Sequence, residues 1–323
     1  MAEWHDILSH LQNKRLVWYS QCSQLLHAIS NRYIQQAQWK KLRFTGCVMN
    51  GDVEGVKYLV ERCGADVHAF EEGALRYASS NGHTEVVRYL VENGADLHST
   101  NEEALRNASE NGHVQLVKYL VENGADVHAF ENDSWRMSVL RLASKNGHLE
   151  IVRYLVEQGA DVHEENDNAL RHASINGHLD VVRYLVEKGV DVHALNDSAL
   201  RYASAHGHLE VVKYLVDEGG ADVHARDEEA LRCASSHGHV QLVEYLARKC
   251  GANVHARNDV ALCLASEYDH LDVVQCLVDS GADVHAQNEE ALRLASQGSN
   301  LGMVKYLISK GPRCIIGGPR PGW

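Results

Sequence analysis

The sequence predicts an all-α solenoid, which is a stack of short helical hairpins, and three observations support this fold class. One phrase of roughly 30 residues recurs along most of the 323-residue chain. Most copies carry two short apolar stripes with helical spacing, and each stripe is usually followed by a glycine, although Asp269 replaces one of them. A single hairpin of this kind cannot bury its apolar faces, whereas stacked copies can.

The recurring phrase is clearest between Ala104 and Val127. Its opening triplet, Ala-Leu-Arg or a close variant, returns every 30 or 31 residues, with one longer spacing of 35. The triplets begin at Ala74, Ala104, Val139, Ala169, Ala199, Ala230, Ala261 and Ala291. A degenerate copy at 50–69 fits the second half of the phrase, so we count about nine repeats. In a solenoid of this kind each repeat contacts only its neighbours.

The repeat from Asn101 to Ala129 predicts two helices and a link. Apolar residues at i, i+1 and i+4 from Ala104 form a narrow stripe, and the Asn-Gly pair at 111–112 ends this first helix. The stretch 114–121 carries the broad apolar face of a second helix. Residues 125–129 form a short extended link, and we expect the Asn or Asp after each link to cap the next helix. The predicted caps are Asn101, Asn166, Asn196, Asp227, Asn258 and Asn288.

The composition argues against several classes of function. The formal net charge is −13 with neutral histidines, so the average surface repels nucleic acid and anionic membranes. No apolar run is long enough to span a bilayer, and the N-terminus does not resemble a signal peptide. The eight cysteines are irregularly spaced and include no CxxC pair, which indicates free thiols in a reducing, intracellular compartment.

The second half of the phrase, NGHxEVVRYLVENGADVHA, resembles the ankyrin repeat, and the resemblance covers residues 43–311. It implies an ankyrin-type α-solenoid in which first helices and links line a concave face. These repeats run about 30 residues rather than 33 and open with ALR rather than TPLH. We therefore expect the β-hairpin finger between repeats to be shortened to a tight turn. The ALRxAS and GADVHA variant is similar to ankyrin families encoded by giant DNA viruses of amoebae.

Three segments depart from the repeat. Residues 1–42 precede it, and their helical apolar spacing indicates either an N-terminal helical cap or a small partner-binding module such as a divergent F-box. Five extra residues at 134–138 lie before one triplet; insertions of this kind often reach the binding face, but Trp135 could equally fold back as filler. The last repeat loses the usual turn, which predicts a capping repeat, and 312–323 is predicted to be a flexible tail.

Histidine recurs in two series, one after the turn between helices and one at the end of each link. Packed helices lie about 8–10 Å apart, so histidines of successive repeats cannot share a metal that needs bonds of about 2 Å. We therefore expect no metal site and no cofactor, and we expect the imidazoles to bond backbone groups. If the turn histidines stay neutral, stability should fall between roughly pH 6 and 5.

Arginine forms a third series, at the last position of the ALR triplet. Its members are Arg76, Arg106, Arg141, Arg171, Arg201, Arg232 and Arg293. We expect these side chains to bind link carbonyls or acidic residues next door. An anion-binding stripe is the alternative, and the overall acidity argues against it.

The partner-binding surface is sought where the repeats differ on a constant frame. Three rows vary: the position after the ALR triplet, the position three residues later, and the link tip. Apolar side chains at such positions indicate an interface, and the alternatives are drift or packing between repeats. The candidate partner-binding residues are Phe70, Tyr77, Phe130, Trp135, Arg136, His172, Ile175, Leu195 and Tyr202.

Together these features predict a non-enzymatic scaffold for protein–protein recognition, monomeric and cytoplasmic. Neither G-x-S-x-G nor HExxH nor another catalytic signature occurs. If the viral resemblance holds, the partner is a host protein and the location is the host cytoplasm. Two alternatives remain, which are an adaptor that recruits ubiquitin machinery through residues 1–42 and a structural or virion-associated spacer.

Overall fold

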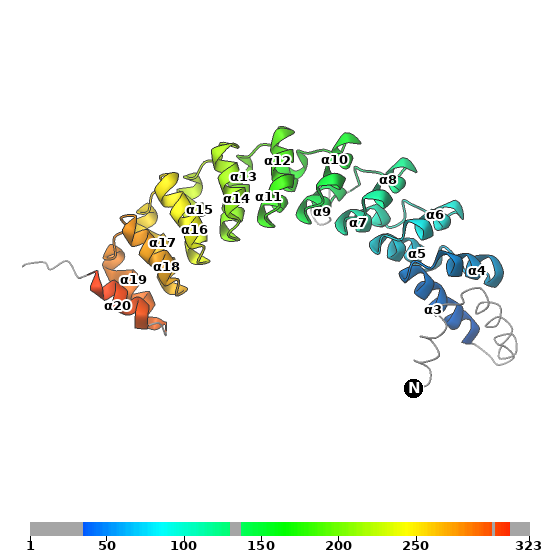
Figure 1. Ribbon diagram of the computed structural model, residues 1–323, viewed down its shortest axis with the longest axis horizontal. Coiled ribbons are helices and arrows are strands. Elements are labelled where there is room, and N and C mark those ends of the chain that lie inside the picture. Colours follow the sequence, from blue (N-terminus) through cyan, green and yellow to red (C-terminus); the bar gives the residue numbers. More distant parts are fainter. Residues whose placement is uncertain (1–34, 130–136, 299–300, 311–323) are drawn as a thin grey trace, which may run out of the picture. The chain divides into compact units, whose positions relative to one another are not determined.

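A computed structural model describes residues 35–129, 137–298 and 301–310, and at 35–41 and Phe70 it describes the backbone alone. The described residues form eighteen α-helices and one π-helical turn and contain no strand (Figure 1). Consecutive helices pair into nine hairpins, one for each predicted repeat. The all-α solenoid is therefore confirmed within these residues.

Each repeat contributes a first and a second helix. The first helices are α3 (Gln35–Met49), α5 (Ala69–Ser80), α7 (Glu103–Glu110), α9 (Val139–Lys145), α11 (Glu164–Ile175), α13 (Ala194–Ala205), α15 (Ala225–Ser236), α17 (Ala256–Glu267) and α19 (Ala286–Gln297). The second helices are α4 (Val53–Cys63), α6 (Thr84–Glu92), α8 (Val114–Glu122), α10 (Leu149–Glu157), α12 (Leu179–Glu187), α14 (Leu209–Asp217), α16 (Val240–Glu244) with the π-helical turn η1 (Tyr245–Lys249), α18 (Leu271–Asp279) and α20 (Leu301–Ser309).

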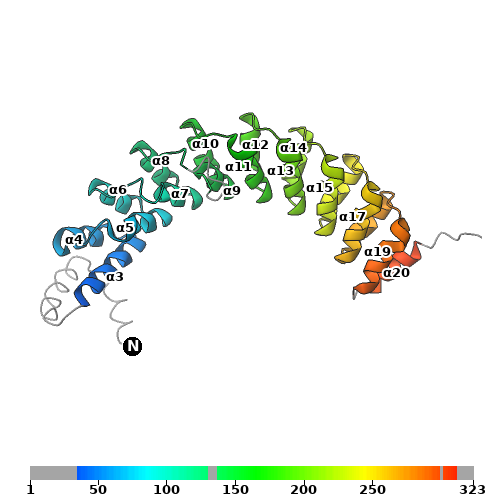
Figure 2. The ribbon, with the colours of Figure 1, turned by 180° about the vertical axis from the view of Figure 1, so that it is seen from behind.

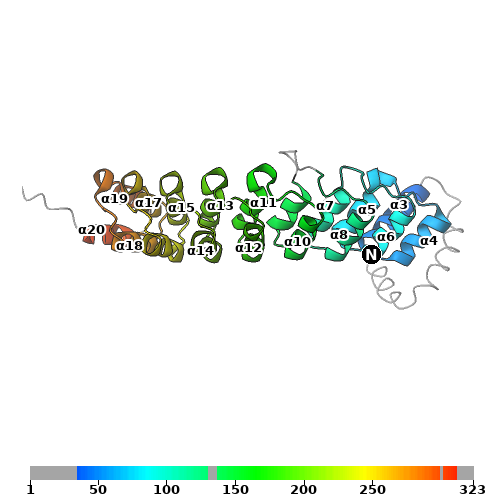
Figure 3. The same ribbon diagram turned by 90° about the horizontal axis from the view of Figure 1, so that it is seen from above.

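The chain forms two compact bodies, Met1–Asp96 and Leu97–Trp323. In the N-terminal body α3 packs against α4 and α5, and α4 packs against α6. In the C-terminal body each first helix packs against the next first helix, from α7 through to α19. From α11 onward, Figure 3 shows the first helices in one row and the second helices in another, and Figure 2 shows the same order from behind. Packing therefore follows chain order within each body.

Small residues let neighbouring first helices approach closely. Each ALR triplet is followed two residues later by an alanine with no exposed surface, as at Ala173 and Ala203. Second helices supply larger groups, such as the fully buried Leu155 and Leu185. Together they form a continuous core that no single hairpin could make, because each hairpin buries its face only against its neighbours.

Glycine follows most first helices, and in six of the described repeats a histidine of the next repeat packs against it. Gly177 has a φ of +76°, and a Cβ built there would lie 2.5 Å from Nδ1 of His208. The same imidazole donates from Nε2 to the carbonyl oxygen of Ile175 at 2.8 Å. His148, His178, His239 and His270 repeat this arrangement, so the prediction that turn histidines bond backbone groups is confirmed for them.

The link is a left-handed turn of three successive residues in place of a β-hairpin finger. In the repeat of α13 these are Leu195, Asn196 and Asp197, with φ between 53° and 56°. The cap prediction for Asn101, Asn196 and their equivalents is therefore wrong, because they occupy the middle of this turn and cap no helix. Their identity still makes sense, since Asn and Asp tolerate the left-handed region better than other non-glycine residues.

Several predictions fall at or beyond the edge of the description. The boundary predicted between 42 and 43 lies inside α3. Residues 1–34, the insertion up to residue 136 and the tail at 312–323 lie outside the described residues. The cap, insertion and tail interpretations therefore stay predictions.

Candidate functional site

The candidate site is the surface formed by the first helices and the link tips, which we call the first-helix face. The links contribute to it because the first residue of the left-handed turn is exposed in several repeats. Leu195, Arg226 and Arg257 hold this position, and all three are exposed. The frame is constant from repeat to repeat, and the projecting side chain varies.

A buried carboxylate stabilises most of the described links, and the repeat of α13 shows how. Asp197, the third left-handed residue, is 5% exposed. Its Oδ1 accepts from Nδ1 of His193 at 3.0 Å and from the backbone N–H of Asp222 in the next repeat at 2.9 Å. Asp259 makes the equivalent bonds to His255 and Asp283. One carboxylate thus joins its own link to the following one.

These histidine–carboxylate pairs correct the prediction for the link histidines, whose imidazoles bond side chains rather than backbone. The pairs are His68–Glu72, His98–Glu102, His163–Asp167, His193–Asp197, His224–Glu228, His255–Asp259 and His285–Glu289. The sequence carried the signal, since an acidic residue stands four positions after nearly every link histidine. Hydrogen bonds to Glu72 and Glu228 raise the pKa of His68 and of His224.

Two members of the arginine series, Arg201 and Arg232, bind link carbonyls as predicted, whereas Arg171 and Arg293 bond a residue of their own helix. Arg201 donates from Nε to the Asn196 carbonyl at 2.8 Å and from Nη2 to the Leu195 carbonyl at 3.0 Å. Its Nη1 lies 2.9 Å from Glu229 of the next repeat. All three nitrogens of this guanidinium are therefore engaged, which fixes the link from which Leu195 projects.

Leu195 and Tyr202 are the exposed apolar residues of one repeat. They are 48% and 42% exposed. The left-handed turn separates Leu195 from the helical residues that precede Tyr202, and Arg201 is the side chain that contacts both. Its guanidinium carbon lies 5.7 Å from the centre of the Tyr202 ring while it holds the Leu195 carbonyl.

The other predicted site residues are placed less favourably. Tyr77 is 50% exposed, in the N-terminal body. His172 and Ile175 are half-buried on α11. The side chains of Phe70, Phe130, Trp135 and Arg136 lie outside the described residues. Of the nine, the structure brings Leu195 and Tyr202 together in one repeat and places His172 on the preceding first helix.

His172 has a pKa lowered to about 4, first by burial and then by the positive charges of Arg141, Arg171 and Lys145. Its neutral form therefore stabilises the fold fully above its unfolded pKa of about 6.5, and this contribution is lost as the pH falls toward about 4. Burial also lowers the pKa of His208, which acts in the same sense. The raised pKa values of His68 and His224 act oppositely, since their contribution is present below about 6.5 and lost as pH rises.

We expect His172→Leu to reduce the loss of stability on acidification by about 1–2 kcal/mol between pH 7 and 4, since solvent screens part of the shift. Leucine is the matched replacement because Leu142 and Leu264 occupy the equivalent position. Denaturant unfolding of both proteins at several pH values measures the slope. Equal slopes for the two proteins would show that His172 does not titrate as described.

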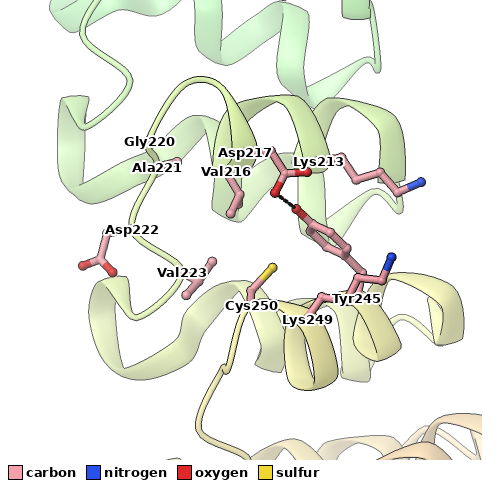
Figure 4. Close-up of a pocket in the computed structure, with 10 residues that line it drawn as sticks. All are labelled: Lys213, Val216, Asp217, Gly220, Ala221, Asp222, Val223, Tyr245, Lys249 and Cys250. Atoms are coloured by element: carbon pink, nitrogen blue, oxygen red, sulfur yellow. Dashed lines mark hydrogen bonds between the residues drawn. The ribbon is translucent and has the colours of Figure 1, made fainter.

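A pocket lies between α14 and η1, away from the first-helix face (Figure 4). It measures about 710 Å³, and the Tyr245 hydroxyl donates to Asp217 across it at 2.7 Å. Lys213 and Lys249 oppose Asp217 and Asp222, so the lining favours neither sign of charge. The signal in the sequence was the two 31-residue spacings, each of which adds one residue near this point.

Cys233, Cys250 and Cys263 are poorly suited to act as nucleophiles. Burial raises the pKa of Cys233 and Cys250, and it raises that of Cys263 to about 11. Thiols of this kind stay protonated at neutral pH and are poor nucleophiles. Among the residues the structure describes, no group of three or more His, Cys, Asp or Glu side chains could hold a metal ion. None of the described helices is long and apolar enough to cross a membrane.

The sequence matches the family model for ankyrin repeats at residues 44–131, 128–196, 193–258 and 231–316. The chain belongs to the ankyrin repeat family. Among solved structures, the crystal structure of the human ASB11 ankyrin repeat domain is similar, with 25% sequence identity and a TM-score of 0.57, covering 65% of this chain and 99% of that one. No curated protein matches the sequence. Ankyrin repeats generally mediate protein–protein interaction and are typically not enzymes.

Proposed function

We propose that this ankyrin repeat chain is a non-enzymatic recognition scaffold that binds a protein partner through the first-helix face. The observation that carries the proposal is the exposed pair Leu195 and Tyr202. Both are large apolar side chains, and Arg201 bonds the backbone carbonyl from which Leu195 projects and lies over the Tyr202 ring. Binding energy concentrates in such preorganised anchors, because little entropy is lost when a partner covers them.

We expect the double variant Leu195→Ala, Tyr202→Ala to weaken partner binding by at least about tenfold, since each anchor is worth on the order of 1–2 kcal/mol. The partner is first identified by placing a photo-crosslinking phenylalanine analogue at position 202 of the full chain. Affinity for that partner is then measured by calorimetry for the parent and the variant.

Tyr268→Ala provides the matched control. Tyr268 is 56% exposed but lies at the turn after α17, outside the first-helix face. Its replacement should leave affinity unchanged. Equal crosslinking from positions 202 and 268, or equal losses in the two variants, would refute a first-helix binding surface.

The adaptor alternative depends on residues 1–42, and it needs a modified deletion. Removing all 42 residues would cut α3, which packs on α4 and α5. A deletion that ends at residue 34 keeps this helix. Loss of a ubiquitin-ligase component alone in that deletion would favour the adaptor, whereas retention of the crosslinked partner favours the scaffold. The resemblance to giant-virus families supports a host protein as that partner, met in the host cytoplasm.

A further inference from the structure

We propose that the first-helix face over α9 and α11 binds an acidic segment of the protein partner, with Arg141, Lys145 and Arg171 receiving its carboxylate. This inference rests on the proposed function and adds the chemistry of the partner. It concerns Arg141 and Arg171, each of which has a guanidinium nitrogen without a hydrogen-bond partner among the described residues.

Arg171 differs from Arg201 at the equivalent position. Arg201 uses all three of its nitrogens, on two carbonyls and on Glu229. Arg171 donates from Nη2 to Asn168, while its Nη1 is buried without a hydrogen-bond partner among the described residues. The reason lies in the sequence, because the place of Glu229 is taken by Ser198 in the repeat that follows Arg171.

Arg141 and Arg171 share one carboxylate. Nη1 of Arg141 lies 2.7 Å from Glu165, and Asn168 donates to the same carboxylate oxygen at 2.8 Å while accepting from Arg171. Arg141 is 6% exposed, and its Nε is also buried without a partner in the described part of the chain. The single negative charge of Glu165 thus serves both guanidinium groups, one directly and one through Asn168.

Lys145 adds a third positive charge to this cluster. It lies one helical turn after Arg141 on α9, and no ion pair of its side chain occurs among the described residues. All three side chains lie close enough to His172 to lower its pKa, which is consistent with their lying close to one another. The cluster is therefore a local excess of positive charge in a chain whose net charge is −13.

An anionic group satisfies this cluster better than water does. Buried guanidinium nitrogens without partners are costly, and charge-assisted bonds to a carboxylate or phosphate are strong. Tyr202 and Leu195 are exposed on the next repeat after Arg171, so a partner with an apolar side chain beside its acidic residue would cover them. The complementary ligand is a peptide segment with one acidic and one apolar anchor.

The test selects peptides from a random display library on the immobilised full chain. We expect the enriched peptides to contain Asp or Glu and to bind at least about tenfold more weakly to Arg171→Gln. Their affinity should also fall as NaCl rises from 50 to 300 mM, because the interaction is electrostatic. A synthetic peptide with phosphoserine in place of the acidic residue distinguishes a phosphate preference from a carboxylate preference.

A second pair of variants keeps Arg171 in place. Ser198→Glu supplies the carboxylate that Glu229 gives to Arg201, so it should block the selected peptide, whereas Ser198→Gln should not. Arg293→Gln is the distant control, since Arg293 is paired with Glu290 at the far end of the array. Circular dichroism confirms that each variant is folded.

Three outcomes overturn the inference. Enriched peptides without acidic residues, or equal binding to Ser198→Glu and Ser198→Gln, would remove the anion site. Tighter binding of the phosphoserine peptide would replace the acidic partner with a phosphorylated one. Peptides that still require Leu195 and Tyr202 in those cases leave the proposed function intact, whereas peptides that ignore Leu195 and Tyr202 count against both.

Discussion

Gly177→Ala should lower the free energy of unfolding of its part of the array by about 2–4 kcal/mol. Alanine at a φ of +76° costs roughly 1–2 kcal/mol. The new Cβ would also lie 2.5 Å from Nδ1 of His208 and push this imidazole off the glycine. The bond to the Ile175 carbonyl would then be lost, which adds about 1–2 kcal/mol.

Gly189→Ala isolates the histidine contact. Gly189 has a φ of +89°, and no atom lies within 4 Å of a Cβ built there. It carries the backbone cost alone, so its loss should be about 1–2 kcal/mol. Chemical denaturation gives the total effect, and hydrogen exchange of the amides in α11 and α13 locates it. Losses of equal size at the two glycines would show that His208 adds nothing to the constraint.

Asp197→Ala should cost about 3–4 kcal/mol, because three effects act together. The backbone N–H of Asp222 loses its acceptor, His193 loses its partner, and alanine must adopt a φ of 54°. Because the lost bond to Asp222 joins two repeats, the loss of stability should extend to α15. Asp197→Asn should recover part of the loss, since asparagine keeps an acceptor oxygen and tolerates this backbone conformation.

Glu289 offers the matched control for this carboxylate. Like Asp197, it has a left-handed backbone and pairs with the histidine four residues before it, here His285. Its side chain, however, is 45% exposed. Glu289→Ala should therefore lose the backbone term and little more, about 1–2 kcal/mol. Guanidinium unfolding of both alanine variants measures the difference. If Glu289→Ala lowers the free energy of unfolding as much as Asp197→Ala does, burial of the carboxylate does not determine how strongly it stabilises the link.

The repeats and the helix ends could be predicted from the sequence, because the residues that mark them favour a single local structure. The period of the ALR triplets predicted the repeats, and the glycines predicted the helix ends, because no other residue tolerates the conformation and the histidine contact at Gly177. The cap prediction failed at Asn196, where two conformations favour the same residue. Asparagine suits both a helix cap and a left-handed turn, and the choice between them depends on where the chain must go next.

The candidate site was only partly predictable for a similar reason. Leu195 and Tyr202 were identifiable as apolar exceptions in a polar row. Their mutual arrangement was not, because it depends on Arg201 reaching back to the link and forward to Glu229. Arg171 looked like an ordinary member of its series until its hydrogen bonds could be compared with those of Arg201.

By itself, the sequence determined the class of fold, the family and the position of every repeat, since these follow from periodic spacing and local backbone preference. The tertiary structure alone decided which partner each recurring polar residue takes, because those partners belong to the next repeat or across a turn. A histidine packs against a glycine or pairs with a carboxylate, and an arginine uses all of its nitrogens or leaves one without a partner, according to the neighbour that the stack places beside it.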